Sequence, residues 1–331
     1  MIEVRPLDPD DDAQARAFWR VNRDAVADQP YHPYPPWEAA RVFLREGRPQ
    51  SVEVHLAAWD GQAMVGAGSA AGSTADNTDL ARAEVAVVPD RRRAGIGSAV
   101  LDGLVTWARE HGRTTLTSEV LAPLDAEGPG ALFARRHGFE VDLVDAFKVA
   151  DLHATQGQWE ALAAETAPHH VDYRVVTAWG PLPDHLAAGY CALSNRFYEL
   201  APSGEVERAA ETWDLARLRA RDERNRRAGR LELVSLALAA DDEVVALTEI
   251  VCDGADAGHA YQGATIVEPG YRGHRLGLAL KLANHRALLD RLPGTAWIAT
   301  GNADVNAAMN AINDRLGFRV VARGLELARR L

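Results

Sequence analysis

Apolar and polar positions along the chain alternate between the period of a strand and the period of a helix. The clearest helix is predicted at residues 97–111, where one face carries Val100, Leu101, Leu104, Val105 and Ala108. Gly112 follows as a C-cap, and Asp60-Gly61 between two alternating runs indicates a hairpin. In order, the first half is predicted to hold strands at 2–5, 53–59, 63–69, 84–88, 114–120 and 140–149 and helices at 11–26, 97–111 and 130–137.

The second half repeats this order of elements. Its strands are predicted at 173–176, 231–238, 243–251, 261–267, 296–300 and 319–327, and its helices at 184–195, 206–227, 276–289 and 306–316.

Two segments also repeat at the level of residues. Residues 87–97 (VVPDRRRAGIG) match residues 267–277 (VEPGYRGHRLG) at an offset of 180. The Gly-Phe pair at 138–139 matches the pair at 317–318 at an offset of 179. Because order, spacing and the surrounding helix pattern agree at both places, the sequence predicts two homologous domains in tandem.

The length of 331 residues fits two domains, since a typical domain has roughly 100–200 residues. We predict an N-terminal domain at 1–152 and a C-terminal domain at 171–331. Residues 153–170 have weak periodicity and are predicted to be a linker, with a short helix at 158–164.

Composition and charge exclude several classes of protein. The 47 acidic residues outnumber the 36 basic ones, and the net charge of −11 argues against a nucleic-acid partner. No apolar run approaches the roughly 18 residues of a membrane span, and the N-terminal residues lack the basic and apolar regions of a signal peptide. Cys191 and Cys252 form no CxxC pair, so we expect a reduced, cytoplasmic protein without a metal site.

Each copy of the repeated segment places arginine and glycine between a strand and the start of a helix. The first turn of a helix carries unpaired N–H groups and the positive end of the macrodipole, and so favours phosphate. Glycine lets a ligand approach the backbone, and arginine adds charge-assisted hydrogen bonds. In the first copy, the residues predicted to hold a diphosphate are Val87, Val88, Arg92, Arg93, Ala94, Gly95, Ile96, Gly97 and Ser98. In the second copy, they are Val267, Arg272, Gly273, His274, Arg275 and Gly277.

The segment fits neither of two common nucleotide motifs. The chain has no GxxxxGK[ST] loop, and the dinucleotide motif GxGxxG fails because Val100 stands where its third glycine belongs.

The segment instead resembles the signature of the GNAT superfamily, the acyl-CoA-dependent N-acyltransferases. That signature is a strand, V-x-P, [RQ]-x-x-G-x-[GA] and a helix, and residues 87–97 match it completely. The Gly-Phe pairs at 138–139 and 317–318 match the family's second landmark. The resemblance covers both halves and implies an α/β (α+β) chain of two tandem GNAT folds. Each fold would have a mixed, mostly antiparallel central sheet flanked by helices, in a two-domain arrangement distantly like that of mycothiol synthase.

The resemblance also implies an activity. The protein is expected to be an N-acetyltransferase with acetyl-CoA as co-substrate and no metal. The acceptor is expected to be a primary amine of a small molecule or peptide, which attacks directly in a ternary complex. The backbone N–H near Val87 would polarise the thioester carbonyl. No nucleic-acid or membrane partner is expected, and the chain is expected to be a monomer or a homodimer.

Each copy departs from the family pattern in a different place. Arg275 replaces the first motif glycine of the second copy, so that this loop is either degenerate or uses the guanidinium itself to hold a phosphate. The family's later helix carries an Asn that contacts CoA and a Tyr that protonates the leaving thiolate. The second copy keeps Asn306 but has Asn313 for the Tyr, and the first copy has Glu127 and Ala134 at the two positions. We therefore expect the first half to hold CoA.

Two glutamates are candidates for the general base, each with a solvated charge as the alternative. Glu84 lies in the strand before the first loop, and Glu249 is assigned to the strand before the second. The segment 31–37 (YHPYPPW) offers an aromatic wall for the acceptor or, alternatively, a rigid lid on the sheet. Loss of both family tyrosines leaves a second function open, that of a catalytically inactive CoA-binding regulatory or scaffolding protein.

Overall fold

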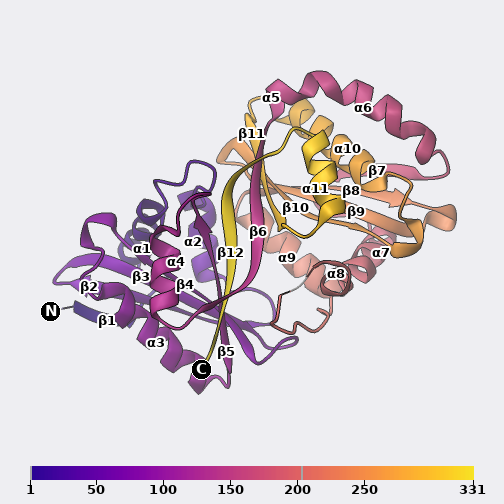
Figure 1. Ribbon diagram of the computed structural model, residues 1–331. Coiled ribbons are helices and arrows are strands. Elements are labelled where there is room, and N and C mark those ends of the chain that lie inside the picture. Colours follow the sequence, from indigo (N-terminus) through magenta and orange to yellow (C-terminus); the bar gives the residue numbers. More distant parts are fainter. Residues whose placement is uncertain (1, 203) are drawn as a thin grey trace. The chain divides into compact units, whose positions relative to one another are not determined.

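The computed structural model describes residues 2–202 and 204–331, which form both strands and helices (Figure 1). The chain divides into two units, each described here by itself. The first unit holds the chain up to Val144, together with Gly204–Arg208 and Gly324–Leu331, and the second holds the rest. Both are α/β units with a mostly antiparallel sheet, as expected.

The sheet of the first unit runs in the order β1-β2-β3-β4-β5, with antiparallel pairs except for the parallel pair β4–β5. Its strands are β1 Ile2–Pro6, β2 Ser51–Asp60, β3 Ala63–Ser73, β4 Leu80–Val87 and β5 Thr115–Ala122. Its helices are α1 Asp12–Ala25, α2 Trp37–Arg45, α3 Ile96–Glu110 and α4 Gly128–Arg136, with a 3-10 turn η1 at Pro89–Arg91. The sequence pattern does not predict α2, a helix of nine residues that begins directly after a proline-rich run.

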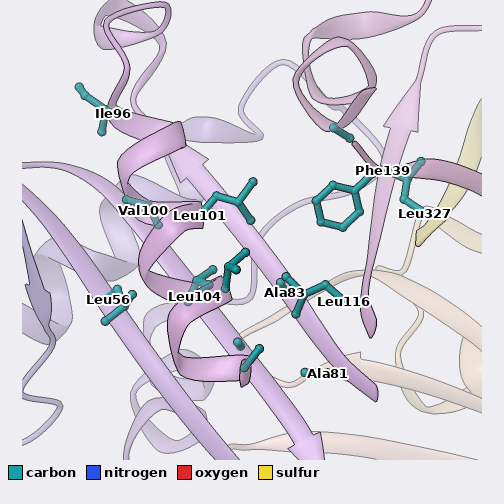
Figure 2. Close-up of a cluster of buried hydrophobic side chains, with 14 of the residues drawn as sticks. Leu56, Ala81, Ala83, Ile96, Val100, Leu101, Leu104, Leu116, Phe139 and Leu327 are labelled. Atoms are coloured by element: carbon teal, nitrogen blue, oxygen red, sulfur yellow. The ribbon is translucent and has the colours of Figure 1, made fainter. Parts of the chain in front are cut away.

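Helix α3 packs on one face of this sheet, and α1 and α2 pack on the other. Figure 2 shows Val100, Leu101 and Leu104 of α3 beside Leu56, Ala83 and Leu116 of the strands. Gly68 of β3 lets the helix come this close, because a Cβ there would lie 2.3 Å from the Val100 side chain.

The second unit has the same arrangement, with the sheet order β11-β10-β9-β8-β7 and a parallel pair β10–β11. Its strands are β7 Arg174–Trp179, β8 Arg230–Leu238, β9 Val244–Asp253, β10 Asp256–Val267 and β11 Trp297–Ala303. Its main helices are α6 Trp159–Thr166, α7 Asp184–Ser194, α9 Leu215–Arg227, α10 Leu276–Arg291 and α11 Ala307–Arg315. Two helices of one turn, α5 Leu152–Thr155 and α8 Phe197–Leu200, complete it.

The repeat is visible in the element bounds. The 3-10 turn η1 and the start of α3 recur as η5 Pro269–Tyr271 and α10 at an offset of 180. Helix α4 recurs as α11 at an offset of 179. Gly138 and Gly317, which follow these helices, both have a positive φ, 75° and 80°. The predicted tandem repeat is thus a repeat of backbone conformation as well as of residues.

The last strand of each repeat is divided between the units. In β6 Glu140–Asp151, the part from Asp145 pairs antiparallel with β11 of the second unit. In β12 Arg319–Arg330, the part from Gly324 belongs to the first unit, where Leu325 and Leu327 join the core. The units therefore differ from the predicted ranges 1–152 and 171–331, because a sequence repeat does not show which sheet a terminal strand joins.

The predicted linker at 153–170 is part of the second unit. It forms α5, the turn η2 Gln156–Gln158, helix α6 and the turn η3 Ala167–His169. The apolar periodicity of this segment is weak because few of its side chains face the core. The main one is Trp159, which is 4% exposed.

The helix predicted at 206–227 is shorter than expected. Helix α9 begins at Leu215, where the Asp214 carboxylate caps it by accepting a hydrogen bond from Arg217 N at 2.7 Å. Upstream, Gly204–Arg208 belongs to the first unit, where Val206 N donates to the Asp142 carboxylate at 2.8 Å.

We expect Trp159→Ala to destabilise the protein by about 3–5 kcal/mol, the usual cost of removing a large aromatic side chain from a core. Urea unfolding followed by circular dichroism measures the loss. Gln158→Ala, at the exposed neighbouring position, is the matched control and should change stability little. Equal, small effects of both substitutions would mean that this segment is a linker after all.

Helix α10 carries a buried lysine whose charge opposes folding. Lys281 is 1% exposed, and its Nζ donates to Asn313 Oδ1 at 2.8 Å. Burial, with a further effect from the Lys148 charge, lowers the pKa of Lys281 to about 7. An unfolded lysine titrates near pH ~10.4, so between these values the unfolded chain binds the additional proton, and this group adds stability as pH rises.

Lys281→Met should therefore raise stability relative to the wild type most at about pH 7, and the gain should shrink toward pH ~10. Denaturant unfolding of both proteins across this range measures the difference. The substitution also leaves Asn313 Oδ1 without its donor, a cost that does not depend on pH. A difference that stays constant with pH would show that Lys281 is not forced toward its neutral form.

Candidate functional site

The loop between β4 and α3, residues 88–98, is called here the first anion loop. Arg93 and Gly95 both have a positive φ, 65° and 81°, and Gly95 is the N-cap of α3. Both residues are exposed, and a Cβ at Gly95 would meet nothing within 4 Å. The turn therefore leaves the N–H groups at the start of α3 facing open space, as an anion site requires.

The loop between β10 and α10, residues 268–278, is called the second anion loop, and its backbone repeats the first. Gly273 and Arg275 have positive φ values of 89° and 55°, and Arg275 is the N-cap of α10. Each loop thus has one glycine and one arginine in the left-handed conformation, but in exchanged order. For an arginine this conformation costs about 1–2 kcal/mol.

Arg92 and Arg272, which the sequence predicts to hold phosphate, instead donate hydrogen bonds to backbone carbonyl oxygens of the protein. Arg92 Nε donates to Val87 O at 3.3 Å, and its Nη2 donates to Ala25 O at 2.8 Å. Arg272 Nε donates to Val267 O, also at 3.3 Å. Both guanidinium groups thus tie the loop back to the end of the preceding strand, so that Arg93 is the exposed arginine of the first anion loop.

The remaining predicted loop residues are mostly engaged in packing. A Cβ at Gly97 would lie 3.1 Å from the Phe133 ring, and one at Gly277 would lie 3.1 Å from Ile312, so both glycines let the later helix approach. Ile96 is buried, and Ser98 Oγ lies 3.0 Å from His137 Nε2. Ala94 is exposed next to Gly95.

The central strands separate beside both loops. Strands β4 and β5 pair only from Leu80 to Arg82, although β4 continues to Val87. Val88 N donates to Val65 O of β3 at 3.2 Å, so the alternation along a strand turns the N–H of Val87 toward the gap on the β5 side. In the second unit, Glu268 N donates to Val245 O at 2.9 Å, and Val267 N–H is turned in the same way.

A row of polar side chains crosses the first sheet on the face that α1 covers. His55 of β2, Ser69 of β3 and Glu84 of β4 stand in register, and His55 Nδ1 lies 2.9 Å from Ser69 Oγ. Burial lowers the pKa of His55, which keeps its ring neutral. The sequence pattern does not single out His55 or Ser69, since only the strand register brings them beside Glu84.

Glu84 is half exposed, and one arginine links it to a second carboxylate. Arg82 Nε lies 3.1 Å from Glu84, and Arg82 Nη2 lies 3.3 Å from Glu119 of β5. The sequence reasoning misses Glu119, whose strand neighbours give no signal of a site. Two carboxylates around one guanidinium leave one net negative charge on this face, which favours a cationic ligand.

In the segment 31–37, one aromatic residue lies near Glu84 and another packs on helix α1. Burial raises the pKa of Tyr34, and the charge of Glu84 raises it further, so Tyr34 lies near the carboxylate and keeps its proton. Trp37 instead begins α2 and packs on Trp19 of α1, with ring centroids 6.0 Å apart. Trp19 Nε1 donates to Pro35 O at 2.9 Å, which fixes the segment on α1.

The candidates in the second unit are held by protein partners. Glu249 lies in β9, and β10 follows β9 before the second anion loop begins. The prediction that Glu249 lies in the strand directly before that loop is therefore wrong. Its carboxylate accepts a hydrogen bond from Tyr190 OH at 2.8 Å. Asn306 caps α11 by accepting from Met309 N at 3.1 Å, and Asn313 is fully buried between Lys281 and Asn302.

The corresponding positions of the first unit carry no such group. Glu127 is the N-cap residue of α4 but pairs with Arg135 at 2.9 Å, and Ala134 is buried in the core. The side chains in that part of the first unit therefore include no acid in the position of the family tyrosine.

In residues 2–202 and 204–331, no group of three or more His, Cys, Asp or Glu side chains is arranged to hold a metal ion. None of the described helices combines the length and apolar character needed to cross a membrane.

Comparisons with known proteins agree with this geometry. Residues 51–141 match the family model of the acetyltransferase (GNAT) domain. A tandem GNAT protein from the clavulanic acid biosynthesis pathway has a TM-score of 0.82 and 26% identity, over 100% of this chain and 98% of its own. A GCN5-related N-acetyltransferase from Sphaerobacter thermophilus has a similar fold, with a TM-score of 0.64 and 16% identity, over 99% of this chain and 95% of its own. No curated protein sequence matches the chain.

The matched segment contains β2 to β5, the first anion loop and the row from His55 to Glu84. Residues 51–141 thus form an acetyltransferase domain of the GNAT type, and the whole chain has a fold similar to that of a tandem GNAT protein, which supports an N-acetyltransferase.

Proposed function

We propose that the first unit transfers an acetyl group from acetyl-CoA to a primary amine of a small molecule or a peptide. The observation that carries this proposal is the first anion loop, whose exposed glycine and arginine precede α3 beside a gap in the sheet. In the GNAT family such a strand, loop and helix serve acyl transfer from acetyl-CoA.

The loop fits the diphosphate of CoA. The first N–H groups of α3 have no partner within the helix, and Gly95 leaves the approach to them open. The side chain of Arg93 is exposed, and within residues 2–202 and 204–331 it makes no hydrogen bond or ion pair. Its guanidinium is therefore available for a charge-assisted contact to phosphate. Bound there, acetyl-CoA would supply an activated thioester.

The gap between β4 and β5 supplies the polar groups that the reaction needs. The N–H of Val87 faces the gap and can donate to the oxygen on which negative charge develops. Glu84, on the same strand, can accept the proton of the attacking amine, directly or through water. Because Ala134 replaces the family tyrosine, the thiolate leaves without that acid, which a thiol pKa near 8.5 allows.

The reaction is proposed to run by direct attack in a ternary complex. Both cysteines are buried, and burial raises the pKa of each thiol, that of Cys252 to about 11. Neither thiol is thus a ready thiolate for an acyl-enzyme.

A groove on the first unit is proposed to take the body of the acceptor. It has a volume of about 360 Å³ and lies between β2 and the end of α2. Its lining is Pro6, Leu7, Pro9, Leu44, Gly47, Ser51, Glu53, Val54 and His55. His55 belongs to this lining and to the row that ends at Glu84, so a ligand in the groove would have its amine end directed along that row.

Gly95→Glu should abolish CoA binding, because it places a negative charge and a side chain where the phosphates approach α3. Isothermal titration calorimetry with CoA measures the loss, and thermal unfolding checks that the variant is folded. Gly112→Glu, at another exposed glycine with positive φ, is the matched control and should bind CoA normally. Unchanged affinity of folded Gly95→Glu protein would place the CoA site elsewhere.

Glu84→Gln should lower kcat by about 10²–10⁴, the usual contribution of a general base, while KM for acetyl-CoA changes little. Release of free thiol from acetyl-CoA in the presence of a panel of primary amines gives the rate. Glu140→Gln, an exposed glutamate of β6, is the control and should retain full activity. Absence of thiol release by the wild type with every amine would favour the CoA-binding regulatory or scaffolding protein instead.

A further inference from the structure

Resting on the proposed function, we infer that Glu165 is the internal anion of the second anion loop, so that the chain binds one CoA, in its first unit. Glu165 lies near the end of α6, in the segment whose pattern predicts a linker. Its two carboxylate oxygens form ion pairs with Arg275, the N-cap residue of α10, and with Arg315 at the end of α11.

These two arginines are the cations that a phosphate at the second loop would need. Arg275 lies at the helix N-terminus itself, where the macrodipole adds a positive potential. A carboxylate held by two guanidinium groups is bound as a phosphate would be, through charge-assisted hydrogen bonds. The Arg275 hydrogen bond is the main cause that lowers the pKa of Glu165, so the anion is present at neutral pH.

The Glu165 carboxylate belongs to helix α6, which is held in place by contacts with α10. Trp159, at the start of α6, is buried in the core, and its ring lies tilted against that of His285, with ring centroids 5.5 Å apart. Arg286 pairs with Glu160 at 2.8 Å and donates to Trp159 O at 3.3 Å. After α6, His169 O lies 3.2 Å from His274 Nδ1 in the second anion loop.

Because contacts at both ends hold α6 along α10, the position of Glu165 does not depend on its own ion pairs. Half-exposed ion pairs contribute little to stability by themselves. As a tethered group, however, Glu165 competes with free CoA at an effective concentration of the order of millimolar or above. CoA at ordinary concentrations would therefore not displace it.

Among residues 2–202 and 204–331, no carboxylate forms an ion pair with Arg93 of the first anion loop. Arg136, the counterpart of Arg315, and Arg93 are free of ion pairs within the part of the chain that the structure describes. The two loops therefore share a backbone conformation and differ in whether the chain itself supplies the anion.

The decisive variant is Glu165→Ala in the Gly95→Glu background, titrated with CoA by calorimetry. The wild type should bind one CoA per chain, and Gly95→Glu alone should bind none. Gly95→Glu/Glu165→Ala should recover binding of one CoA through the second loop, with an affinity at least about tenfold above the weakest that the titration of Gly95→Glu would detect. Glu160→Gln in the same background is the matched control. It loosens α6 at Arg286, leaves the carboxylate on Arg275, and should recover nothing.

Absence of binding by the folded double variant would overturn the inference, since the second loop would then be degenerate whatever Glu165 does. Two CoA molecules per wild-type chain would overturn it as well. Binding of one CoA by Gly95→Glu alone would instead contradict the proposed function, so the two failures are distinguishable. If Glu165→Ala does not fold, the isosteric Glu165→Gln carries the same test, because α6 remains anchored by Trp159.

Discussion

The structure of each unit depends on one turn of the chain, from the central strand into the helix that covers it. Two residues with positive φ, at 93 and 95 and again at 273 and 275, make this turn, and the arginine directly before them, at 92 or 272, ties it to the strand end. The turn sets the start of α3 or α10, and glycines in β3 allow α3 to lie close to the first sheet. The same turn leaves helix N–H groups unpaired, so the constraint that builds the fold also creates the proposed anion site.

Because this loop occurs in both units, the two units differ in the anion that the loop can bind. In the first unit the loop is open to solvent beside the separated strands. In the second, a carboxylate of the chain itself pairs with the arginine at the helix start. The two loops thus share a backbone conformation, and helix α6 makes the second loop different because it places Glu165 beside Arg275. The exchanged order of glycine and arginine in the two loops fits this difference. Position 275 pairs with Glu165 and therefore needs an arginine side chain, whereas the first loop has a glycine at the corresponding position 95.

The groups proposed to act on the first sheet are related by strand register. His55, Ser69 and Glu84 come from three strands and face the side that α1 and the 31–37 segment cover. The candidates of the second unit lie in a different environment, since Glu249 and the buried Asn313 both form hydrogen bonds within the protein. The proposed chemistry therefore combines the open loop with this polar row, in one unit.

The sequence alone determined the repeat, the order of most strands and helices, and the positions of both anion loops. These follow from local rules, namely hydrophobic period, helix start signals and the spacing of glycine and arginine. It did not determine that Arg92 braces the loop, that residues 153–170 pack on α10, or that the terminal strands divide between the units. Those outcomes depend on partners distant in sequence. A guanidinium, a tryptophan or an edge strand has the same local pattern whether its partner is solvent, phosphate or another part of the chain, and only the tertiary structure selects among them.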